Sequence, residues 1–347
     1  MIREALTSVT RGDSLAETDA AEVMGEIMRG EATPSQLGGL LAALRLKGET
    51  ADEVTGFTRT MREFALRVHA KTDAPMMDTC GTGGDGAGTF NISTAAAFVV
   101  AAAGQPVAKH GNRAASGKCG SADVLEALGA QVTLSPEQVS ACIESTGFGF
   151  MFAPAFHPAM AHVAPVRREL GVRTVFNVIG PLTNPAGAQT QVIGVADRKL
   201  VPLMGEALLR LGCRRVLIVH GEDGLDEISL SAPTLVCEID GQEGTGRTYH
   251  LTPDLLGVRV ANRESVLGGD ATANARIMRD ALAGREGEPV TDMVAANAGA
   301  ALYASGHART LSDGARLAFD TIRSGRATAT LDAFVAATHD AATVAAG

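Results

Sequence analysis

The sequence predicts an α/β protein in which a small all-helical domain precedes a larger α/β domain with a central, mostly parallel sheet flanked by helices. The first 70 residues show helical patterns only. From Pro75 onward, short apolar runs that end in glycine-rich or polar turns alternate with capped helices, and beyond Ala271 an alanine-rich pattern is helical to the end. Strands that alternate with helices are typical of a parallel sheet covered on both faces. A length of 347 residues also fits two domains.

Capping patterns mark the helices of the N-terminal part. The segment Thr33–Gln36 supplies an N-cap, a proline at the first helical position and the residue that closes a capping box. Leucines then recur at the spacing of one helix face, at Leu37, Leu40, Leu41 and Leu44. Gly48 ends this helix, and Thr50 with Glu53 opens the next. Because such short helices are marginal alone, their apolar faces must pack against each other, the rest of the chain or a second subunit.

The alternating part contains five candidate strands and four candidate helices. The strands are expected at Met76–Met77, Val107–Ala108, Phe148–Phe152, Gln191–Val195 and Val216–Val219. The helices are expected near Thr94–Ala103, Ser121–Leu128, Ser135–Ser145 and Leu200–Leu211. The stretch Leu235–Leu251 has the pattern of an extended hairpin.

Composition excludes several classes of protein. With a net charge of -9, the chain is not expected to bind nucleic acid or an anionic membrane surface. The longest small-apolar run, Ala95–Ala103, is too short to span a bilayer, and the N-terminus lacks the layout of a signal peptide. The five cysteines are an odd number without CxxC spacing, which indicates reduced thiols in the cytoplasm.

The glycine-rich segment Asp78–Gly86 directly follows a predicted strand. Glycines let the backbone approach a ligand closely, so that successive N–H groups can point at anionic oxygens. The segment Asn91–Thr94 then opens a helix, whose free amides suit phosphate. The spacing also matches GxGxxG, but a dinucleotide site needs an acidic residue at the end of the next strand, where Lys109 stands.

A second segment, Lys109–Lys118, runs from a strand end into a loop. Lys109 and Arg113 can neutralise phosphate charge, and Asn112 can both donate and accept hydrogen bonds. The segment is one residue too long for a Walker A loop and has Cys119 where Ser or Thr would hold Mg²⁺. The position of these residues at a strand's carboxyl end favours a ligand-contacting role for His110 over a merely structural one.

Two further segments stay open on spacing alone. Gly180–Pro185 (GPLTNP) is a rigid connection, a hinge or turn and nothing more. The adjacent carboxylates Asp226 and Glu227 are either solvated or the hard oxygen ligands of Mg²⁺ in a polyphosphate site.

Together and in this order, five strings resemble the anthranilate phosphoribosyltransferase family: DTCGTGGDG, FNIS, KHGNRAASGKCGSADVLEALG, HPAMAHVAPVRRELGVRTVFNVIGPLTNP and DE. The resemblance covers the chain from about Leu15 to the C-terminal helices. It implies a helical domain at residues 1–70, to which a segment at about 158–180 returns, and an α/β domain at 71–157 and 181–347. It also implies an active site in the cleft between the domains, a homodimer formed through the helical domain, and a cytoplasmic enzyme.

The activity implied is transfer of the phosphoribosyl group of phosphoribosyl pyrophosphate (PRPP) to the amine of anthranilate, a step of tryptophan biosynthesis. The resemblance assigns to PRPP Gly81, Gly84, Asp85, Thr89, Asn91, Ile92, Ser93, Thr94, Lys109, His110, Gly111, Asn112, Arg113, Ala114, Ala115, Ser116, Gly117 and Ser121. It assigns to anthranilate Gly81, His110, Asn112 and Arg167, and to two Mg²⁺ ions bound with PRPP Ser93, Asp226 and Glu227. His110, Asn112 and Arg167 are the implied catalytic residues.

The chain departs from many relatives at Phe156 and Ala161, where they carry Tyr and Lys, and either change could alter the anthranilate channel. The implied chemistry is displacement at C1 of the ribose, in which most of the catalysis is electrostatic. We therefore expect no covalent enzyme intermediate and no obligatory strong base. Two alternatives are an enzyme like the pyrimidine nucleoside phosphorylases and a nucleic-acid-binding relative of the same fold without enzyme activity; the GPLTNP segment with Asp226-Glu227 disfavours the first, and the net charge of -9 the second.

Overall fold

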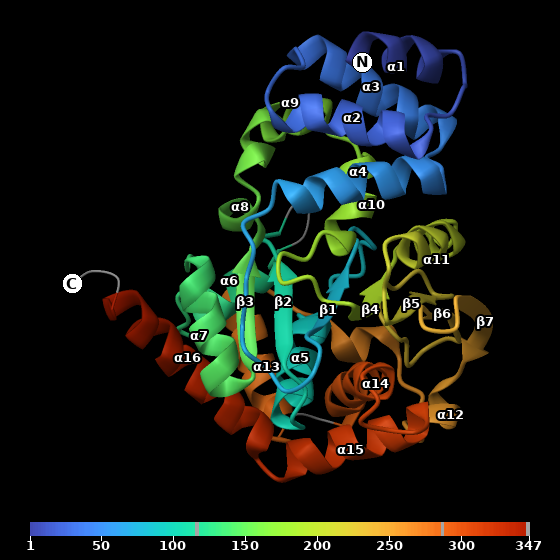
Figure 1. The fold of residues 1–347 in the computed structure, drawn as a ribbon. Helices are drawn as coiled ribbons and strands as arrows, with labels where there is room; N and C mark the ends of the chain where they lie inside the picture. The colour runs from blue at the N-terminus through green and yellow to red at the C-terminus, as the bar shows by residue number, and fades with distance from the viewer. Residues whose placement is uncertain (115–117, 286–287, 345–347) are drawn as a thin grey trace.

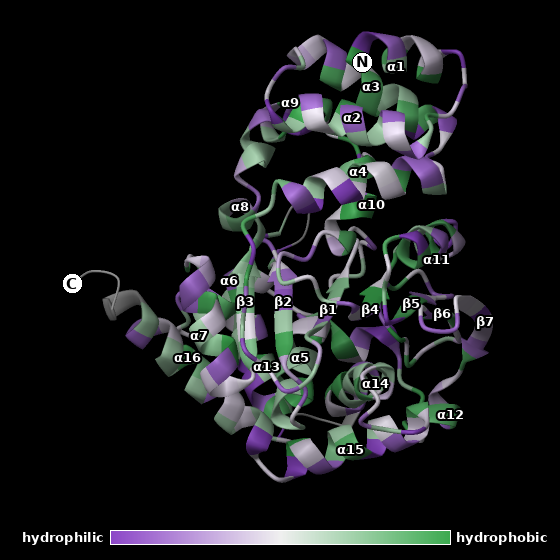
Figure 2. Cartoon of the chain, in the orientation of Figure 1, coloured by the Kyte–Doolittle hydropathy of each residue, from purple (hydrophilic) through white to green (hydrophobic). Residues whose placement is uncertain are grey.

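Four helices form the N-terminal part of the chain. The computed structural model describes residues 1–114, 118–285 and 288–344. The four helices are α1 (Ile2–Thr10), α2 (Glu17–Met28), α3 (Pro34–Lys47) and α4 (Ala51–Glu63). Both predicted capping boxes are present, at Thr33 with Gln36 and at Thr50 with Glu53. The leucines of the predicted apolar face of α3 are all buried. Hydrophobic and hydrophilic residues alternate along these helices, as expected for helices packed on one side (Figure 2).

A segment from the middle of the chain packs on these helices (Figure 1). It consists of the short helices α8 (Ala153–Phe156), η1 (Pro158–His162), α9 (Ala164–Leu170), α10 (Val175–Ile179) and η2 (Gly180–Leu182). Helix α9 contacts α3, and α10 contacts α3 and α4. Buried residues of the segment, including Val166 and Phe176, share one hydrophobic core with the N-terminal helices.

The larger part of the molecule is built on a seven-stranded sheet in the order β3-β2-β1-β4-β5-β6-β7. The strands are β1 (Met77–Gly81), β2 (Val107–Gly111), β3 (Phe148–Phe152), β4 (Thr190–Gly194), β5 (Arg215–Gly221), β6 (Thr234–Asp240) and β7 (Thr245–Leu251). The first five strands pair in parallel, while β6 and β7 form an antiparallel hairpin at one edge. The predicted mostly parallel sheet and the predicted hairpin are thus confirmed.

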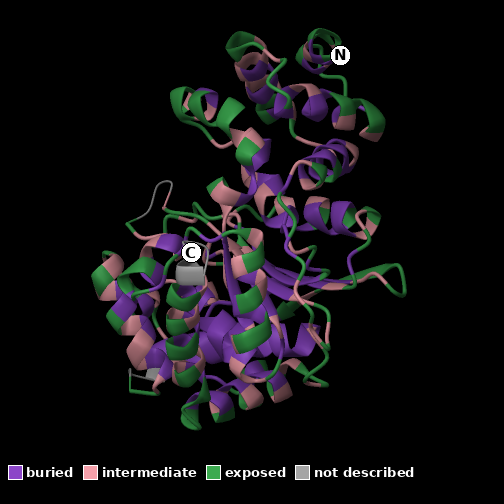
Figure 3. Cartoon of the chain, turned by 60° about the vertical axis from the view of Figure 1, so that its left-hand side comes forward, coloured by how far each residue is buried: buried purple, intermediate pink, exposed green. Residues whose placement is uncertain are grey.

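Helices cover both faces of the sheet, so most strands are buried, whereas the edge strand β7 is mostly exposed (Figure 3). These helices are α5 (Ile92–Ala102), α6 (Ser121–Ala127), α7 (Pro136–Thr146), α11 (Leu200–Arg210), α12 (Pro253–Leu256), η3 (Arg263–Val266), α13 (Ala271–Leu282), α14 (Glu288–Ala304), α15 (Leu311–Arg323) and α16 (Arg326–Val344). Alternate residues of β5 face different layers. Leu217 and Val219 belong to the core with α5 and α14, whereas Val216 and Ile218 belong to the core with α11 and the N-terminal helices.

Two expectations from composition can be compared with the structure. Within the described residues, no helix has the length and apolar character that crossing a membrane requires. All five cysteines are free thiols, as predicted. Several strand boundaries differ from the prediction. β1 extends to Gly81, beyond the predicted Met76–Met77, so the glycine-rich segment begins inside the sheet. β2 extends to Gly111, and the bounds of β4 and β5 differ by one or two residues.

Candidate active site

Four of the five parallel strands end in glycine. They are β1, β2, β4 and β5, which end at Gly81, Gly111, Gly194 and Gly221. Space explains two of these glycines. A Cβ at Gly194 would lie 1.6 Å from the backbone oxygen of Asp226, and one at Gly111 would lie 2.2 Å from Oγ of Ser121. Because the carboxyl ends of parallel strands meet at one edge, the loops that follow these strands converge there.

The loop after β1 takes a backbone conformation that only glycine adopts easily. Gly83, Gly84, Gly86 and Gly88 all have φ between 62° and 79°. A short antiparallel contact holds the far end of the loop, with a bridge between Thr89 and Leu267. The predicted glycine loop is therefore a defined turn at the end of a strand, as a backbone anion cradle requires.

Asp226 and Glu227 connect the two predicted phosphate-binding elements. Oδ2 of Asp226 accepts the N–H of Gly83 at 2.9 Å. Oε1 of Glu227 accepts the N–H of Ser93, in the first turn of α5, at 3.2 Å. Both carboxylates are half-buried and hydrogen-bonded to the candidate phosphate-binding elements, which favours the metal-ligand alternative over full solvation.

The electrostatics of this acidic pair favour a bound cation. Burial, with the nearby Asp85 carboxylate, raises the pKa of Asp226 to about 7. Burial, with the charge of Asp226, raises the pKa of Glu227 to about 8. The described residues contain no group of three His, Cys, Asp or Glu side chains arranged to enclose a metal ion. A Mg²⁺ ion here would therefore need oxygens from a ligand or water, which Mg²⁺ usually retains.

Lys109 is a buried cation at the end of β2. Its Nζ donates to the carbonyl oxygen of Thr79 and, at 3.4 Å, to Oγ of Ser93. Burial lowers the pKa of Lys109, and the charge of Asp78 opposes this shift. Burial likewise raises the pKa of Asp78, against the charge of Lys109. Lys109 is therefore held beside Ser93, at the amino end of α5.

The GPLTNP segment does more than turn the chain. Nδ2 of Asn184 donates at 2.8 Å to Oδ2 of Asp78 and to the carbonyl oxygen of Ala108, so it joins β1 to β2. Backbone carbonyl oxygens of the same segment accept hydrogen bonds from two histidine rings, that of Gly180 from His110 and that of Thr183 from His157. The interpretation of this segment as only a hinge or turn is too narrow.

His110 and His157 form a buried pair whose rings lie 5.1 Å apart. Burial, with the neighbouring His157, lowers the pKa of His110 to about 3. Burial lowers the pKa of His157 to about 4. Both rings are therefore neutral near pH 7. Within the described part of the chain, Nε2 of each ring is buried without a hydrogen-bond partner.

The loop after β2 is partly described. The backbone oxygen of Asn112 accepts from Oγ of Ser121 at 3.2 Å. Arg113 forms ion pairs with Asp123 at 3.0 Å and Glu126 at 2.5 Å, so its guanidinium is already neutralised by α6. The N–H of Ala114 donates to Asp123. The remaining residues predicted in this loop, Ala115, Ser116 and Gly117, lie outside the described residues.

Other predicted residues lie around the start of α5. Nδ2 of Asn91 donates to the carbonyl oxygen of Cys119 at 3.2 Å, and Oδ1 of Asn91 accepts from Asn274 at 3.0 Å. Ile92 and Thr94 are buried, at 1% exposure each, so mainly their backbone can face a ligand.

Arg167 lies on α9, outside the sheet. Its Nη2 donates to Oδ1 of Asn177 at 3.5 Å, and its guanidinium lies over the ring of Phe176. Burial lowers its pKa. In the described residues, no ion pair involves Arg167, and no hydrogen bond joins it to His110 or Asn112. The structure therefore places Arg167 in the segment that returns to the N-terminal helices, with its charge not neutralised by an acidic residue.

Arg173, which the sequence analysis did not single out, contacts the glycine loop from this same segment. Its Nη1 donates to the carbonyl oxygen of Gly83, and its Nη2 to that of Thr82 at 3.4 Å. His157, Asn184 and Gly194 are the other residues of this region that sequence reasoning missed. A glycine at the end of four strands was a visible sequence signal for Gly194. The roles of Arg173, His157 and Asn184 could be seen only in the tertiary structure.

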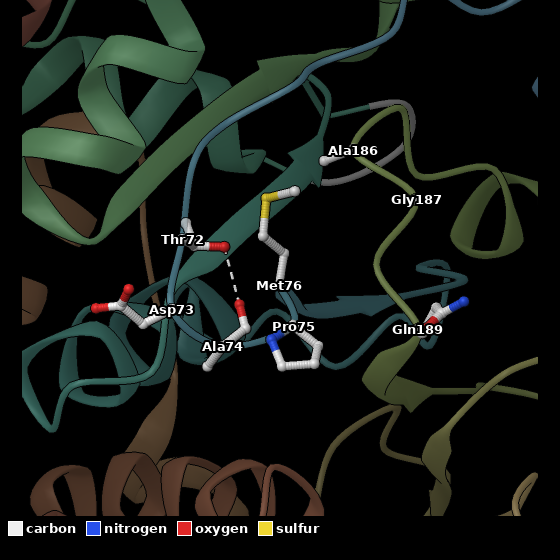
Figure 4. A pocket seen from close by; sticks show the side chains of 8 residues that line it. All are labelled: Thr72, Asp73, Ala74, Pro75, Met76, Ala186, Gly187 and Gln189. Carbon is white, nitrogen blue, oxygen red and sulfur yellow. Dashed lines mark hydrogen bonds between the residues drawn. The ribbon is translucent and has the colours of Figure 1, made fainter.

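A well-formed pocket elsewhere is not this site (Figure 4). Its volume is about 430 Å³, and residues 72–76 with Ala186, Gly187 and Gln189 line it. These residues precede β1 and β4, so the pocket lies at the amino ends of the strands. The glycine loop and the acidic pair lie at the opposite, carboxyl ends of the strands.

Both parts of the chain match known protein families. Residues 3–65 match the helical bundle domain of a glycosyl transferase family, and residues 73–328 match the a/b domain of a glycosyl transferase family. The helical part and the part that contains the sheet are thus those of a glycosyl transferase family.

More detailed similarity comes from individual proteins. The chain is 53% identical over 335 residues to the anthranilate phosphoribosyltransferase of Rubrobacter xylanophilus, with 96% of this chain and 97% of the relative covered. The crystal structure of the enzyme from Thermus thermophilus is similar with a TM-score of 0.91 and 48% identity, covering 96% of this chain and 99% of that one. The structure of the Saccharomyces cerevisiae enzyme in complex with PRPP and Mg is similar with a TM-score of 0.88 and 26% sequence identity, covering 98% of each chain. The chain belongs to the anthranilate phosphoribosyltransferase family.

Proposed function

We propose that this protein transfers the phosphoribosyl group of PRPP to anthranilate, giving N-(5-phosphoribosyl)anthranilate and pyrophosphate in tryptophan biosynthesis. One observation supports the proposal beyond similarity: two half-buried carboxylates with raised pKa values each accept a backbone N–H of a candidate phosphate cradle. Such a site is unfavourable until a cation arrives, and a Mg²⁺–polyphosphate ligand brings one. The S. cerevisiae relative binds PRPP with Mg.

The PRPP side of the site is assigned to the edge formed by β1, β2 and α5. The glycine loop and the N-terminal amides of α5 would bind the phosphate oxygens, with Lys109 beside them. Asp226, Glu227 and Ser93 would hold two Mg²⁺ ions together with PRPP and water. Bound Mg²⁺ supplies positive charge that offsets the charge developing on the leaving pyrophosphate. The other predicted PRPP contacts, including Arg113, stay predictions; the ion pairs of Arg113 with α6 argue that it orders the loop.

The anthranilate side is assigned to His110, Asn112, Gly81 and Arg167. A guanidinium with no acidic partner in the described residues suits a carboxylate ligand, because it can donate two parallel hydrogen bonds. A neutral His110 with an unpaired Nε2 suits an aromatic amine that must be oriented without being protonated. His157, in ring contact with His110, extends this pocket.

The chemistry that follows is a direct displacement. The bond from C1 of the ribose to the pyrophosphate oxygen breaks, and its electron pair leaves with pyrophosphate. The lone pair of the anthranilate nitrogen forms the new C1–N bond, and that nitrogen then loses a proton to water. The site holds the nitrogen in place and stabilises the leaving charge, so neither a covalent enzyme intermediate nor a strong base is required.

Several broader assignments accompany this function. We place the cleft between residues 1–70, with the returning segment at 158–180, and the α/β domain formed by 71–157 and 181–347. A homodimer through the helical domain and action in the cytoplasm are part of the proposal, and the free thiols support the second. A partnership with nucleic acid or membrane is not part of it.

Loss of anthranilate fluorescence tests the function directly. The purified chain should consume anthranilate only when both PRPP and Mg²⁺ are present, and EDTA should stop the reaction. Asp226→Asn with Glu227→Gln should remove activity at ordinary Mg²⁺ while the fold is kept, and near-normal turnover in that variant would contradict the assigned roles. Phosphate-dependent cleavage of pyrimidine nucleosides, or DNA binding that weakens with salt, would instead support the alternatives.

A further inference from the structure

Arg173 connects two parts of the site that the sequence separates. It follows α9 and precedes α10, in the same segment as Arg167. Its side chain reaches the glycine loop and donates to two successive carbonyl oxygens, those of Thr82 and Gly83. The contact is close: a Cβ added at Gly84 would lie 1.8 Å from Nη1 of Arg173.

These two hydrogen bonds fix which way the loop amides point. In a trans peptide group the C=O and the following N–H point in opposite directions. With the carbonyls of Thr82 and Gly83 turned to Arg173, the N–H groups of Gly83 and Gly84 point to the other side of the loop. The N–H of Gly83 there meets Oδ2 of Asp226 at 2.9 Å. Arg173 thus orients both loop amides: that of Gly83 toward Asp226, and that of Gly84 to the same side, where a phosphate cradle would use it.

The same residue also acts on charge and on the returning segment. The positive charge of Arg173 partly opposes the rise in the pKa of Asp226. Thr174, the next residue, donates its N–H to Oδ1 of Asn177 at 3.0 Å, and that oxygen also accepts from Arg167 at 3.5 Å. A short chain of contacts therefore runs from the glycine loop through Arg173 to Arg167.

We propose that Arg173 is a positioning residue that orients the glycine loop for PRPP and ties this loop to the segment carrying Arg167. The inference rests on the proposed function, because it takes PRPP as the ligand of the loop. It explains why Gly84 must be glycine for a reason beyond its φ of 79°: any side chain there would displace the guanidinium.

A double-mutant cycle on PRPP affinity tests this inference. The affinity of the full chain for PRPP with Mg²⁺ is measured by calorimetry for Arg173→Ala, Gly84→Ala and the double variant. Arg173→Ala should weaken PRPP binding about tenfold, the usual effect of losing hydrogen bonds to a charged group. Gly84→Ala should cost clearly less in the Arg173→Ala background, because the displaced guanidinium is already absent.

Gly86→Ala is the matched control for backbone strain. Gly86 has a φ of 66°, and nothing lies within 4 Å of an added Cβ. Its effect should therefore add to that of Arg173→Ala. Arg173→Lys, which keeps the charge but cannot donate in a fork, should restore binding only in part. Unchanged PRPP affinity in Arg173→Ala, or additive effects with Gly84→Ala, would overturn the inference.

A kinetic measurement separates positioning from simple loss of structure. Arg173→Ala should raise the KM for PRPP more than it lowers kcat at saturating PRPP, whereas partial unfolding would lower kcat alone. If the wild-type chain binds PRPP but does not consume anthranilate, the proposed function fails while the calorimetric cycle still decides the role of Arg173.

Discussion

Neutralising the acidic pair should stabilise the ligand-free protein at alkaline pH while it removes activity. The ordinary pKa values of Asp226 and Glu227, 3.8 and 4.5, rise to about 7 and about 8 in the folded state. The folded chain therefore holds more protons than the unfolded chain in this range. Stability from the protonated pair is complete below about pH 4 and is lost as the pH rises to about 8.

The structure sets the size of the effect. At about 1.4 kcal/mol per pKa unit, the two shifts together cost roughly 2–4 kcal/mol of unfolding free energy between about pH 6 and about pH 8.5. Both carboxylates are half-buried, so solvent screens part of this cost and the lower end of the range is expected. Asp226→Asn with Glu227→Gln keeps the size of both side chains and stays neutral at every pH. The stability advantage of the variant should therefore grow by this amount over the same range.

Urea unfolding at the two pH values measures the prediction. The difference between variant and wild type is used, because the shifted histidines cancel in it. The exposed Asp254→Asn serves as a control and should show no such growth. Mg²⁺ added at about pH 8.5 should stabilise the wild type and not the variant, since binding to the folded state alone raises stability. If the wild type and the variant change in parallel with pH, the pair is not strained and the electrostatic argument fails.

Three further predictions concern single residues. Gly83→Val forces a β-branched residue to a φ of 62°, so PRPP binding measured by calorimetry should collapse while the melting temperature without ligand changes far less; unchanged PRPP affinity would make the loop a mere turn. Arg167→Ala should raise the KM for anthranilate about tenfold to hundredfold and leave that for PRPP nearly unchanged, with the exposed Arg168→Ala near wild type; the reverse pattern would relocate the anthranilate site. Asn184→Ala removes the donor to Oδ2 of the buried Asp78, whose Oδ1 keeps the N–H of His110, and should destabilise the protein by about 1–3 kcal/mol in urea unfolding, so an unchanged midpoint would show that Asn184 does not join β1 to β2.

The elements of this fold could be predicted because their signals are local. The capping box at Ser135 and Gln138 needs only four consecutive residues, and the structure contains it. The glycine loop could also be predicted from the sequence, because a cluster of glycines after an apolar run is typical of a turn that follows a strand. The hairpin at Leu235–Leu251 followed from the same kind of pattern, and β6 and β7 pair as expected.

The site could be predicted only in part, because its decisive contacts are distant in sequence. Gly83 and Asp226 are separated by 143 residues, and Gly83 and Arg173 by 90. The spacing of Asp226 and Glu227 alone left solvation and metal binding equally open. The structure adds what spacing cannot show: both carboxylates are half-buried and hold backbone N–H groups, and Gly194 leaves room for the backbone of Asp226.

Asp226 and Glu227 have two roles: they hold backbone amides of the loop and of α5, and they provide negative charge for a cation. These two roles explain how an acidic protein can bind a polyphosphate. One oxygen of Asp226 and one of Glu227 hold the amides of Gly83 and Ser93, which orders the cradle before any ligand arrives. Each carboxylate has a second oxygen, and a cation bound there would remove the repulsion that raises both pKa values. The repulsion between the two carboxylates is therefore relieved only when a cation binds together with the phosphate. Above about pH 8, where both carboxylates are ionised, a bare phosphate without Mg²⁺ would meet two negative charges, so the chain should there select the metal complex of PRPP over the free anion.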